Sequence, residues 1–227
     1  MMVEMMSQRA LVTTAAVLWI AGAAVYVATE AVAAAAFPGY SYATNYISDL
    51  GIPDVGTVGG RAIDSPRHAV MNTGFVVQGL LFLAAALTTL RATTGGPRRS
   101  FAGIAVTYAV GICLVGIVHG GQAEAPTGAL HVVGAGMAIV GGNLAALTAA
   151  VAGRRTGLPR LYVVASATLG TVGLIGLVML QLDSATTSID LLPAGTWERL
   201  AVYTVTGWQV LTGGLMLAAR RTSRTQL

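Results

Sequence analysis

The chain has 227 residues, of which 55% are hydrophobic and 10% are charged. Soluble domains carry about 25% charged residues, so this composition excludes an ordinary soluble domain and favours an integral membrane protein. The formal net charge of +4 comes with no lysine, because every basic side chain is an arginine. These arginines are scattered between apolar runs rather than clustered on one soluble face, which argues against a nucleic-acid partner.

Six apolar segments are each long enough to cross a bilayer, which takes about 20 residues. They cover residues 10–33, 67–90, 100–118, 128–152, 158–182 and 196–219. The first also resembles a secretory signal, but its apolar run exceeds the roughly 7–15 residues of a signal core, so we interpret it as a retained span. The sequence therefore predicts an all-α fold, a bundle of six transmembrane helices forming one domain over residues 1–227.

The charged residues divide unevenly between the two sides of these segments. Ten arginines fall on the side of the termini and three on the other: Arg9, Arg91, Arg98, Arg99, Arg154, Arg155, Arg160, Arg220, Arg221 and Arg224, against Arg61, Arg67 and Arg199. Positive residues stay cytoplasmic. We therefore expect a multi-pass protein of the cell membrane, with both termini cytoplasmic and with loops one, three and five extracytoplasmic.

Loop one, residues 34–66, is the longest connection and contains the polar stretch NYISDLGIPD. A loop of this length is seldom structureless in a compact protein, so we expect it to fold back onto the helix ends as a short re-entrant or interfacial piece. Tyr40, Tyr42 and Tyr46 would then lie at headgroup depth. Asp49 could cap a turn in which Gly51 adopts a left-handed conformation and Asn45 braces the loop, or it could act in a functional site.

Three histidines lie near the same outer interface as this loop: His68, His119 and His131. A histidine could act as a base toward Ser48 as nucleophile. Alternatively, histidines with Asp49 could bind zinc and activate a water molecule, although their spacing matches no standard zinc motif. The purely structural interpretation is that the histidines anchor helix ends. The candidate catalytic residues are Ser48, Asp49, His68, His119 and His131, and the candidate pocket residues are Asn45, Tyr46, Gly51 and Glu124.

Small and polar residues inside the spans predict how the helices pack. Gly134, Ala138 and Gly142 form one stripe, and Ala167, Gly170, Gly173 and Gly176 form another. Such stripes favour a tight pair between the fourth and fifth helices, or a partner helix or homo-oligomer. Asn72, Gln78, Asn143 and Gln209 are expected to form hydrogen bonds between helices. They carry no charge, which argues against an ion-conducting path.

The segment YSYATNYISDLG after the first span, the opening SPRHAVMNTGF of the second and HGGQAEAPTGALH after the third together resemble the domain-of-unknown-function 998 family. This is a family of bacterial and archaeal integral membrane proteins, and the resemblance covers nearly the whole chain. It marks Asn45, Ser48, Asp49 and Gly51 through the Ser-Asp-x-Gly block, and His131 as the histidine that opens the fourth span. The resemblance implies a six-helix bundle and no established activity.

These observations favour an outward-facing polar pocket, roofed by loop one, that binds a lipid headgroup or small amphiphile of the membrane, with or without hydrolysing it. The enzyme version uses histidine as a base or as a zinc ligand. The alternative is a non-catalytic structural or accessory subunit whose small-residue stripes contact a partner. A small transporter is a third, less favoured function, because the sequence has no convincing internal repeat.

Overall fold

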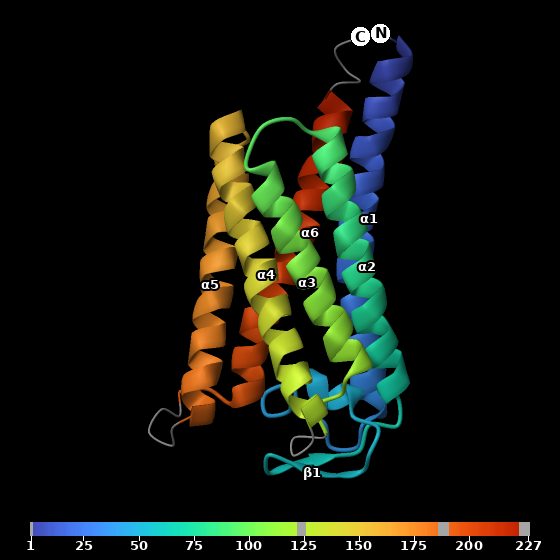
Figure 1. Ribbon diagram of the computed structural model, residues 1–227, viewed down its shortest axis with the longest axis vertical. Coiled ribbons are helices and arrows are strands. Elements are labelled where there is room, and N and C mark those ends of the chain that lie inside the picture. The colour runs from blue at the N-terminus through green and yellow to red at the C-terminus, as the bar shows by residue number, and fades with distance from the viewer. Residues whose placement is uncertain (1, 122–125, 186–190, 223–227) are drawn as a thin grey trace.

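The computed structural model describes residues 2–121, 126–185 and 191–222, and its long elements are six helices running along one axis (Figure 1). They are α1 (Met2–Ala36), α2 (His68–Ala92), α3 (Arg98–Ile117), α4 (Pro126–Thr156), α5 (Arg160–Ala185) and α6 (Ala194–Thr222). All six are long and apolar enough to cross a membrane. The all-α, six-span fold is therefore confirmed, and each predicted segment falls on one helix.

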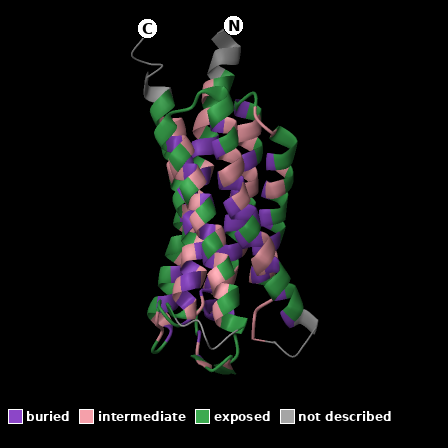
Figure 2. Cartoon of the chain, turned by 90° about the vertical axis from the view of Figure 1, so that its left-hand side faces the viewer, coloured by how far each residue is buried: buried purple, intermediate pink, exposed green. Residues whose placement is uncertain are grey.

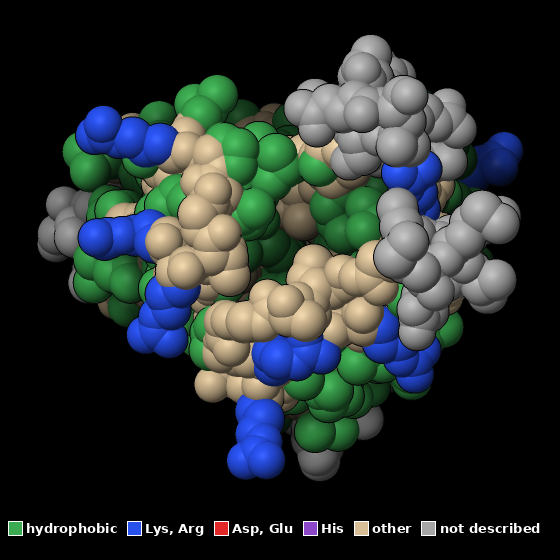
Figure 3. Space-filling model, turned by 90° about the horizontal axis from the view of Figure 1, so that it is seen from above, with side chains coloured by type: hydrophobic (Ala, Val, Ile, Leu, Met, Phe, Trp, Pro, Cys, Tyr) green, Lys and Arg blue, Asp and Glu red, His purple; other side chains and the backbone are tan. Residues whose placement is uncertain are grey.

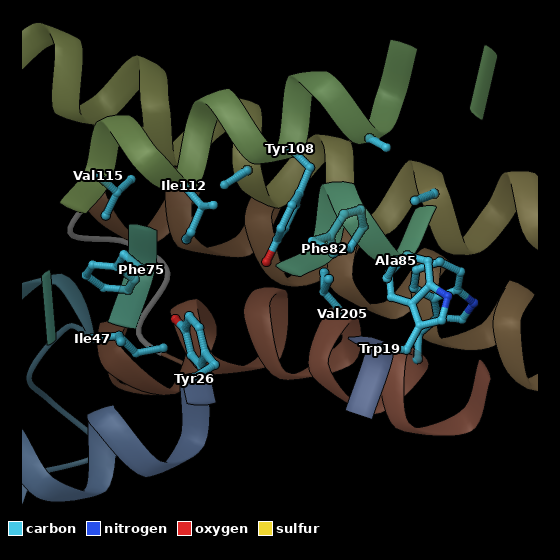
Figure 4. Packing of buried hydrophobic residues seen from close by; sticks show 14 of the residues in the cluster. Trp19, Tyr26, Ile47, Phe75, Phe82, Ala85, Tyr108, Ile112, Val115 and Val205 are labelled. Atoms are coloured by element: carbon cyan, nitrogen blue, oxygen red, sulfur yellow. The ribbon is translucent and has the colours of Figure 1, made fainter. Parts of the chain in front are cut away.

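The helices form a closed ring. Each packs against the next helix in the chain, and α6 also packs against α1 and α4. Buried side chains follow the inner faces while exposed ones, most of them apolar on the spans, cover the outer faces (Figure 2). At the centre, the ring of Trp19 on α1 lies 4.8 Å from that of Phe82 on α2 and 5.1 Å from that of Trp208 on α6. This aromatic cluster joins three helices in the core (Figure 4).

Loop one folds back onto one end of the bundle, as predicted, but its local structure was not foreseen. It contains a 3-10 helix, η1 (Ser48–Gly51), and an antiparallel hairpin of β1 (Gly56–Val58) and β2 (Arg61–Ile63). Gly59 and Gly60 link the strands with φ of +53° and +77°. Two successive positive φ angles match the right-handed twist of paired strands, and glycine adopts them readily.

The arginines gather at the opposite end of the bundle, where α1 begins and α6 ends (Figure 3). Arg91 lies in the last turn of α2, Arg154 and Arg155 lie in the last turn of α4, and Arg98 and Arg160 begin α3 and α5. The uneven distribution of arginine along the chain thus becomes an uneven distribution between the two ends of the molecule. We call these the arginine end and the loop-one end.

The small-residue stripes pack inside the bundle. A Cβ atom on Gly134 or Gly142 of α4 would lie 2.8 Å from Leu114 of α3 or 2.7 Å from Val205 of α6. On α5, a Cβ atom on Gly170 would lie 2.7 Å from a backbone oxygen of α4, and one on Gly176 would lie 2.9 Å from the backbone of α6. The fourth and fifth helices therefore pack against each other, as expected, but through the α5 stripe alone, since the α4 stripe meets α3 and α6. A partner helix or homo-oligomer stays a prediction.

Candidate functional site

Asp49 is the centre of the structure of loop one. Its side chain is 1% exposed and accepts two hydrogen bonds from Arg61, from Nε to Oδ2 at 2.7 Å and from Nη2 to Oδ1 at 2.9 Å. It also accepts bonds from the Tyr46 backbone N–H at 2.9 Å and from Asn45 Nδ2 at 3.3 Å. Four donors nearly saturate a carboxylate, which has about four acceptor positions. Asp49 therefore accepts one backbone N–H of its own turn, as the capping interpretation predicts, while Arg61 and Asn45 occupy the rest of its carboxylate.

Arg61 ties the hairpin to η1 through this carboxylate. Its guanidinium carbon also lies 3.9 Å from the centre of the Tyr46 ring, within the range of a cation–π interaction. Burial lowers the pKa of Arg61, but the hydrogen bonds and the negative charge of Asp49 outweigh burial and leave that pKa above its usual value. Arg61 therefore stays charged and holds the hairpin against η1.

Gly51 is required for close packing and not for a left-handed turn. Among the described residues, positive φ angles occur only at glycines 39, 59, 60, 95, 96 and 157, so the expected left-handed conformation of Gly51 is wrong. A Cβ atom at this position would lie 2.3 Å from Oδ1 of Asn72 on α2. Asn72 Nδ2 donates to the Gly51 carbonyl at 2.9 Å. The missing side chain lets α2 approach η1.

A second ion pair lies within the spans themselves. Arg199 on α6 donates from Nη2 to Glu30 Oε1 on α1 at 3.2 Å, and the Tyr203 hydroxyl donates to both oxygens of Glu30 at 2.9 Å. The exposed fractions are 1% for Glu30 and 7% for Arg199. Charged groups inside a membrane span are destabilising unless they are paired. This network therefore has a structural role, because it joins α1 to α6.

Arg199 also holds loop one. Its Nη1 donates to the Asn45 carbonyl at 2.8 Å and to the Gly195 carbonyl at 3.0 Å, and its Nη2 donates to the Tyr40 hydroxyl. The Tyr42 ring centre lies 4.8 Å from the guanidinium carbon. Burial raises the pKa of Tyr40 well above its usual value, although the charge of Arg199 acts against this, so the hydroxyl stays protonated. Arg199 thus joins α1, α6 and the start of loop one.

The three histidines have different surroundings. His131, which is 7% exposed, donates from Nδ1 to the Val118 carbonyl at 2.6 Å, and His119 and Asp49 are close enough to act on it electrostatically. His119 Nδ1 is buried, and among the described residues it has no hydrogen-bond partner. His68 Nδ1 donates to the Ser65 carbonyl at 3.0 Å, at the start of α2. The structure therefore brings His119, His131 and Asp49 into one region, while His68 ties loop one to α2.

The described part of the chain does not gather a metal centre. In residues 2–121, 126–185 and 191–222, no three His, Cys, Asp or Glu side chains are placed to hold a metal ion. Within the same residues, no histidine forms a hydrogen bond to Ser48. Glu124, a candidate pocket residue, lies outside the described residues. The residues that the structure describes therefore do not form a site that fits zinc.

A cavity of about 40 Å³ lies beneath loop one, between α1, α2, α3, α4 and α6. Figure 4 shows Tyr26, Ile47 and Phe75 facing Ile112 and Val115 across it. Such a volume holds roughly three water molecules. The walls are largely apolar, and Ile47 and Ser48 of loop one form its roof. The remaining lining residues are Tyr108, Ala135, Ala138, Ile139, Glu198, Val202 and Val205.

Glu198 is the acid that borders this cavity. It lies in the first turns of α6, and its Oε2 accepts a hydrogen bond from the Ile47 backbone N–H in the roof. The residue keeps part of its surface accessible, and it borders the cavity. The cavity thus has apolar walls with one carboxylate near its roof, which is the usual plan of a ligand site.

The two features that organise this end were not predicted from the sequence. Arg199 was counted only as a charge of the outer side, and Glu30 and Glu198 were not singled out, although Glu30 falls within the predicted first span and the other two within the sixth. Ionisable residues inside spans are candidates for function by default. That signal would have identified all three residues. The cavity itself depends on packing between five helices and leaves no mark in the sequence.

Comparison with known proteins agrees with this architecture. The sequence model of the family described as "Protein of unknown function (DUF998)" matches residues 20–214, which is most of the chain. The search of curated proteins and the search of solved structures each found no match. The matched range includes loop one, the cavity and both buried ion pairs. This six-span membrane protein therefore belongs to the DUF998 family.

Proposed function

We propose that this protein binds a lipid headgroup or small amphiphile of the membrane in the cavity beneath loop one. The observation that carries the proposal is a cavity with apolar walls and a single carboxylate, roofed by a loop that two ion pairs hold in place. Apolar walls suit the chain of an amphiphile, and a lone polar group suits its head. The bias of arginine toward the opposite end supports an extracytoplasmic position for this site in the cell membrane.

Binding does not require hydrolysis in this proposal. A serine nucleophile needs an adjacent base, and the hydrogen bonds of the described residues give Ser48 no histidine partner. Asp49 is saturated by Arg61, Tyr46 and Asn45, so it does not serve as a base in the geometry observed. We therefore assign Asp49 to holding the roof, and Ser48 to lining the site.

A non-catalytic structural or accessory subunit is the second candidate function. The same saturation of Asp49 favours it, because a loop fixed by ion pairs also serves as a plug over the bundle. The two candidates differ in what copurifies with the protein. A binding protein retains a small molecule in its cavity, whereas a structural subunit retains only lipid around its outer faces.

The test is native mass spectrometry of the protein purified in mild detergent. The wild-type chain is expected to carry a small amphiphile that Ala135→Leu loses, because leucine at this position fills the cavity. Ala129→Leu is the matched control, since Ala129 is an exposed residue of the same helix, and it should retain the molecule. Equal retention by wild type and Ala135→Leu, or an empty wild-type cavity, would overturn the proposal in favour of a structural subunit.

A further inference from the structure

Charged groups at the loop-one end do not balance. Five of them bond loop one to the helix ends: Glu30, Asp49, Arg61, Glu198 and Arg199. Asp49 pairs with Arg61 and Glu30 pairs with Arg199. Among the residues that the structure describes, Glu198 accepts only the backbone N–H of Ile47 and forms no salt bridge. Two guanidiniums pair with two of these three carboxyl groups, so Glu198 is the acid of this set without a guanidinium partner, and it borders the cavity.

The nearest cation is Arg199, which follows Glu198 in the chain and attracts it from a distance. Its Nη1 and Nη2 already donate to Glu30, Tyr40 and two backbone carbonyls, and it forms no salt bridge with Glu198 among the described residues. Neither His119 nor His131 lines the cavity. A carboxylate in such a site is stable when ionised only if it is paired. Among the described residues, no side chain supplies the cation that would keep Glu198 ionised, so a cationic ligand is the partner that this position could take.

The walls of the cavity also favour a cation. Tyr26 and Phe75 line one side with ring centres 5.8 Å apart, and Tyr108 lines another. Aromatic rings attract an ammonium group within about 6 Å of their centres. An anionic headgroup would instead meet the Glu198 carboxylate and be repelled. The volume of about 40 Å³ admits the head of a primary amine together with the first part of its chain.

We infer that the ligand of this cavity is a cationic amphiphile, whose ammonium group pairs with Glu198 while its apolar chain lies along Ile112, Ala135 and Val202. This inference rests on the proposed function and narrows it, because a membrane offers amphiphiles with anionic, neutral and cationic heads. Glu198 is then a binding residue that recognises charge. Ser48 and Ile47 close the site above it.

The experiment compares propylammonium with 1-propanol, two soluble probes of the same chain length that suit a cavity of about 40 Å³, by titration calorimetry at pH 7 on the wild-type protein. Propylammonium should bind about tenfold more tightly, because a charge-assisted pair forms in a site shielded from water. Glu198→Gln keeps an oxygen that accepts the Ile47 N–H and removes the carboxylate. It should bring the two affinities within about twofold of each other without weakening 1-propanol.

Asp183→Asn is the matched control, because it removes a half-buried carboxylate at the loop-one end of α5 that does not line the cavity. It should keep the tenfold preference. Equal binding of the two probes by the wild type would overturn the inference and leave the proposed function standing. If neither probe binds, and if Ala135→Leu retains the same molecule as the wild type, both the inference and the proposed function are overturned. The wild-type comparison holds even if Glu198→Gln fails to fold.

Discussion

Arg199 on α6 and Glu30 on α1 form an ion pair, with Nη2 3.2 Å from Oε1, inside helices that are otherwise almost entirely apolar. The pair closes the ring of helices, since it joins the last helix to the first. The same arginine donates to the Asn45 carbonyl and to Tyr40 of loop one. One side chain thus couples the closure of the bundle to the position of the cavity roof.

Removing one partner of this pair should destabilise the fold strongly. Arg199→Gln leaves the Glu30 carboxylate buried without its cation, and we expect a loss of about 3–5 kcal/mol in the free energy of unfolding. The measurement is reversible unfolding in mixed micelles. The double variant Glu30→Gln, Arg199→Gln should lose less than the two single variants together, because no charge is left unpaired. Additive losses would show that the two side chains do not act as a pair.

Asp49→Asn should loosen the hairpin without unfolding the bundle. The change removes the negative charge that holds Arg61, and hydrogen bonds to charged groups are worth about 1.5–3 kcal/mol. Limited proteolysis should then cleave between residues 56 and 63 faster than in the wild type, while the melting of the helices shifts little. Asp54→Asn is the control, since Asp54 is exposed. An unchanged cleavage rate in Asp49→Asn would contradict the role assigned to this carboxylate.

Gly51→Ala should destabilise the contact between η1 and α2. Its Cβ atom would lie 2.3 Å from Asn72 Oδ1, so the asparagine must move, at a cost of about 1–3 kcal/mol. In an Asn72→Ala background the same change should cost much less, because the clashing amide is gone. Thermal unfolding of the four proteins checks this cycle. A full penalty in both backgrounds would point to a backbone requirement at Gly51 instead.

A close-packed glycine of α5 and an unhindered glycine of α4 should respond differently to replacement by alanine. A Cβ atom on Gly173 would lie 1.9 Å from Asn143 Oδ1 and 2.3 Å from Thr204 Oγ1, where Asn143 also bonds the Ala201 carbonyl of α6 at 2.9 Å. Gly173→Ala should therefore separate α4, α5 and α6 and lower the yield of folded protein. Gly136→Ala meets nothing within 4 Å and should be neutral or slightly stabilising, because alanine favours helix by about 1 kcal/mol over glycine. Size-exclusion profiles of the two variants decide the matter.

The membrane orientation predicted from arginine can be tested by labelling. Cys113 is the only cysteine, so Cys113→Ala gives a background free of thiols. In that background, Asp54→Cys in loop one should react with an impermeant maleimide added to intact cells, and Arg155→Cys at the arginine end should not. The reverse pattern would place loop one in the cytoplasm and remove the extracytoplasmic assignment of the cavity.

The fold was predictable from sequence because its determinants are local. Apolar runs of span length and polar separators specify six helices without knowledge of their neighbours. The polar residues in those runs behave largely as predicted: Gln78 donates to Gln209 at 3.2 Å and Asn143 bonds α6, whereas Asn72 bonds loop one. The hairpin of loop one was missed, since three-residue strands give too short a pattern to recognise.

The site was less predictable because it depends on which side chains meet. Asp49 was identified from its motif, but its four donors include Arg61, which lies 12 residues away across a hairpin. The histidines share one end of the molecule, as the topology required, yet they do not form a metal centre with the other described residues. The role of Glu198 was not predictable, because it depends on the cavity that five helices enclose beside it.

The most direct measurement is a density map of the protein purified from its native membrane, at a resolution that shows bound small molecules. Density that belongs to no protein atom should lie between Tyr26, Ile112 and Glu198, with its polar end at the carboxylate. A cavity closed by the side chains themselves, or filled by ordered water alone, would contradict it.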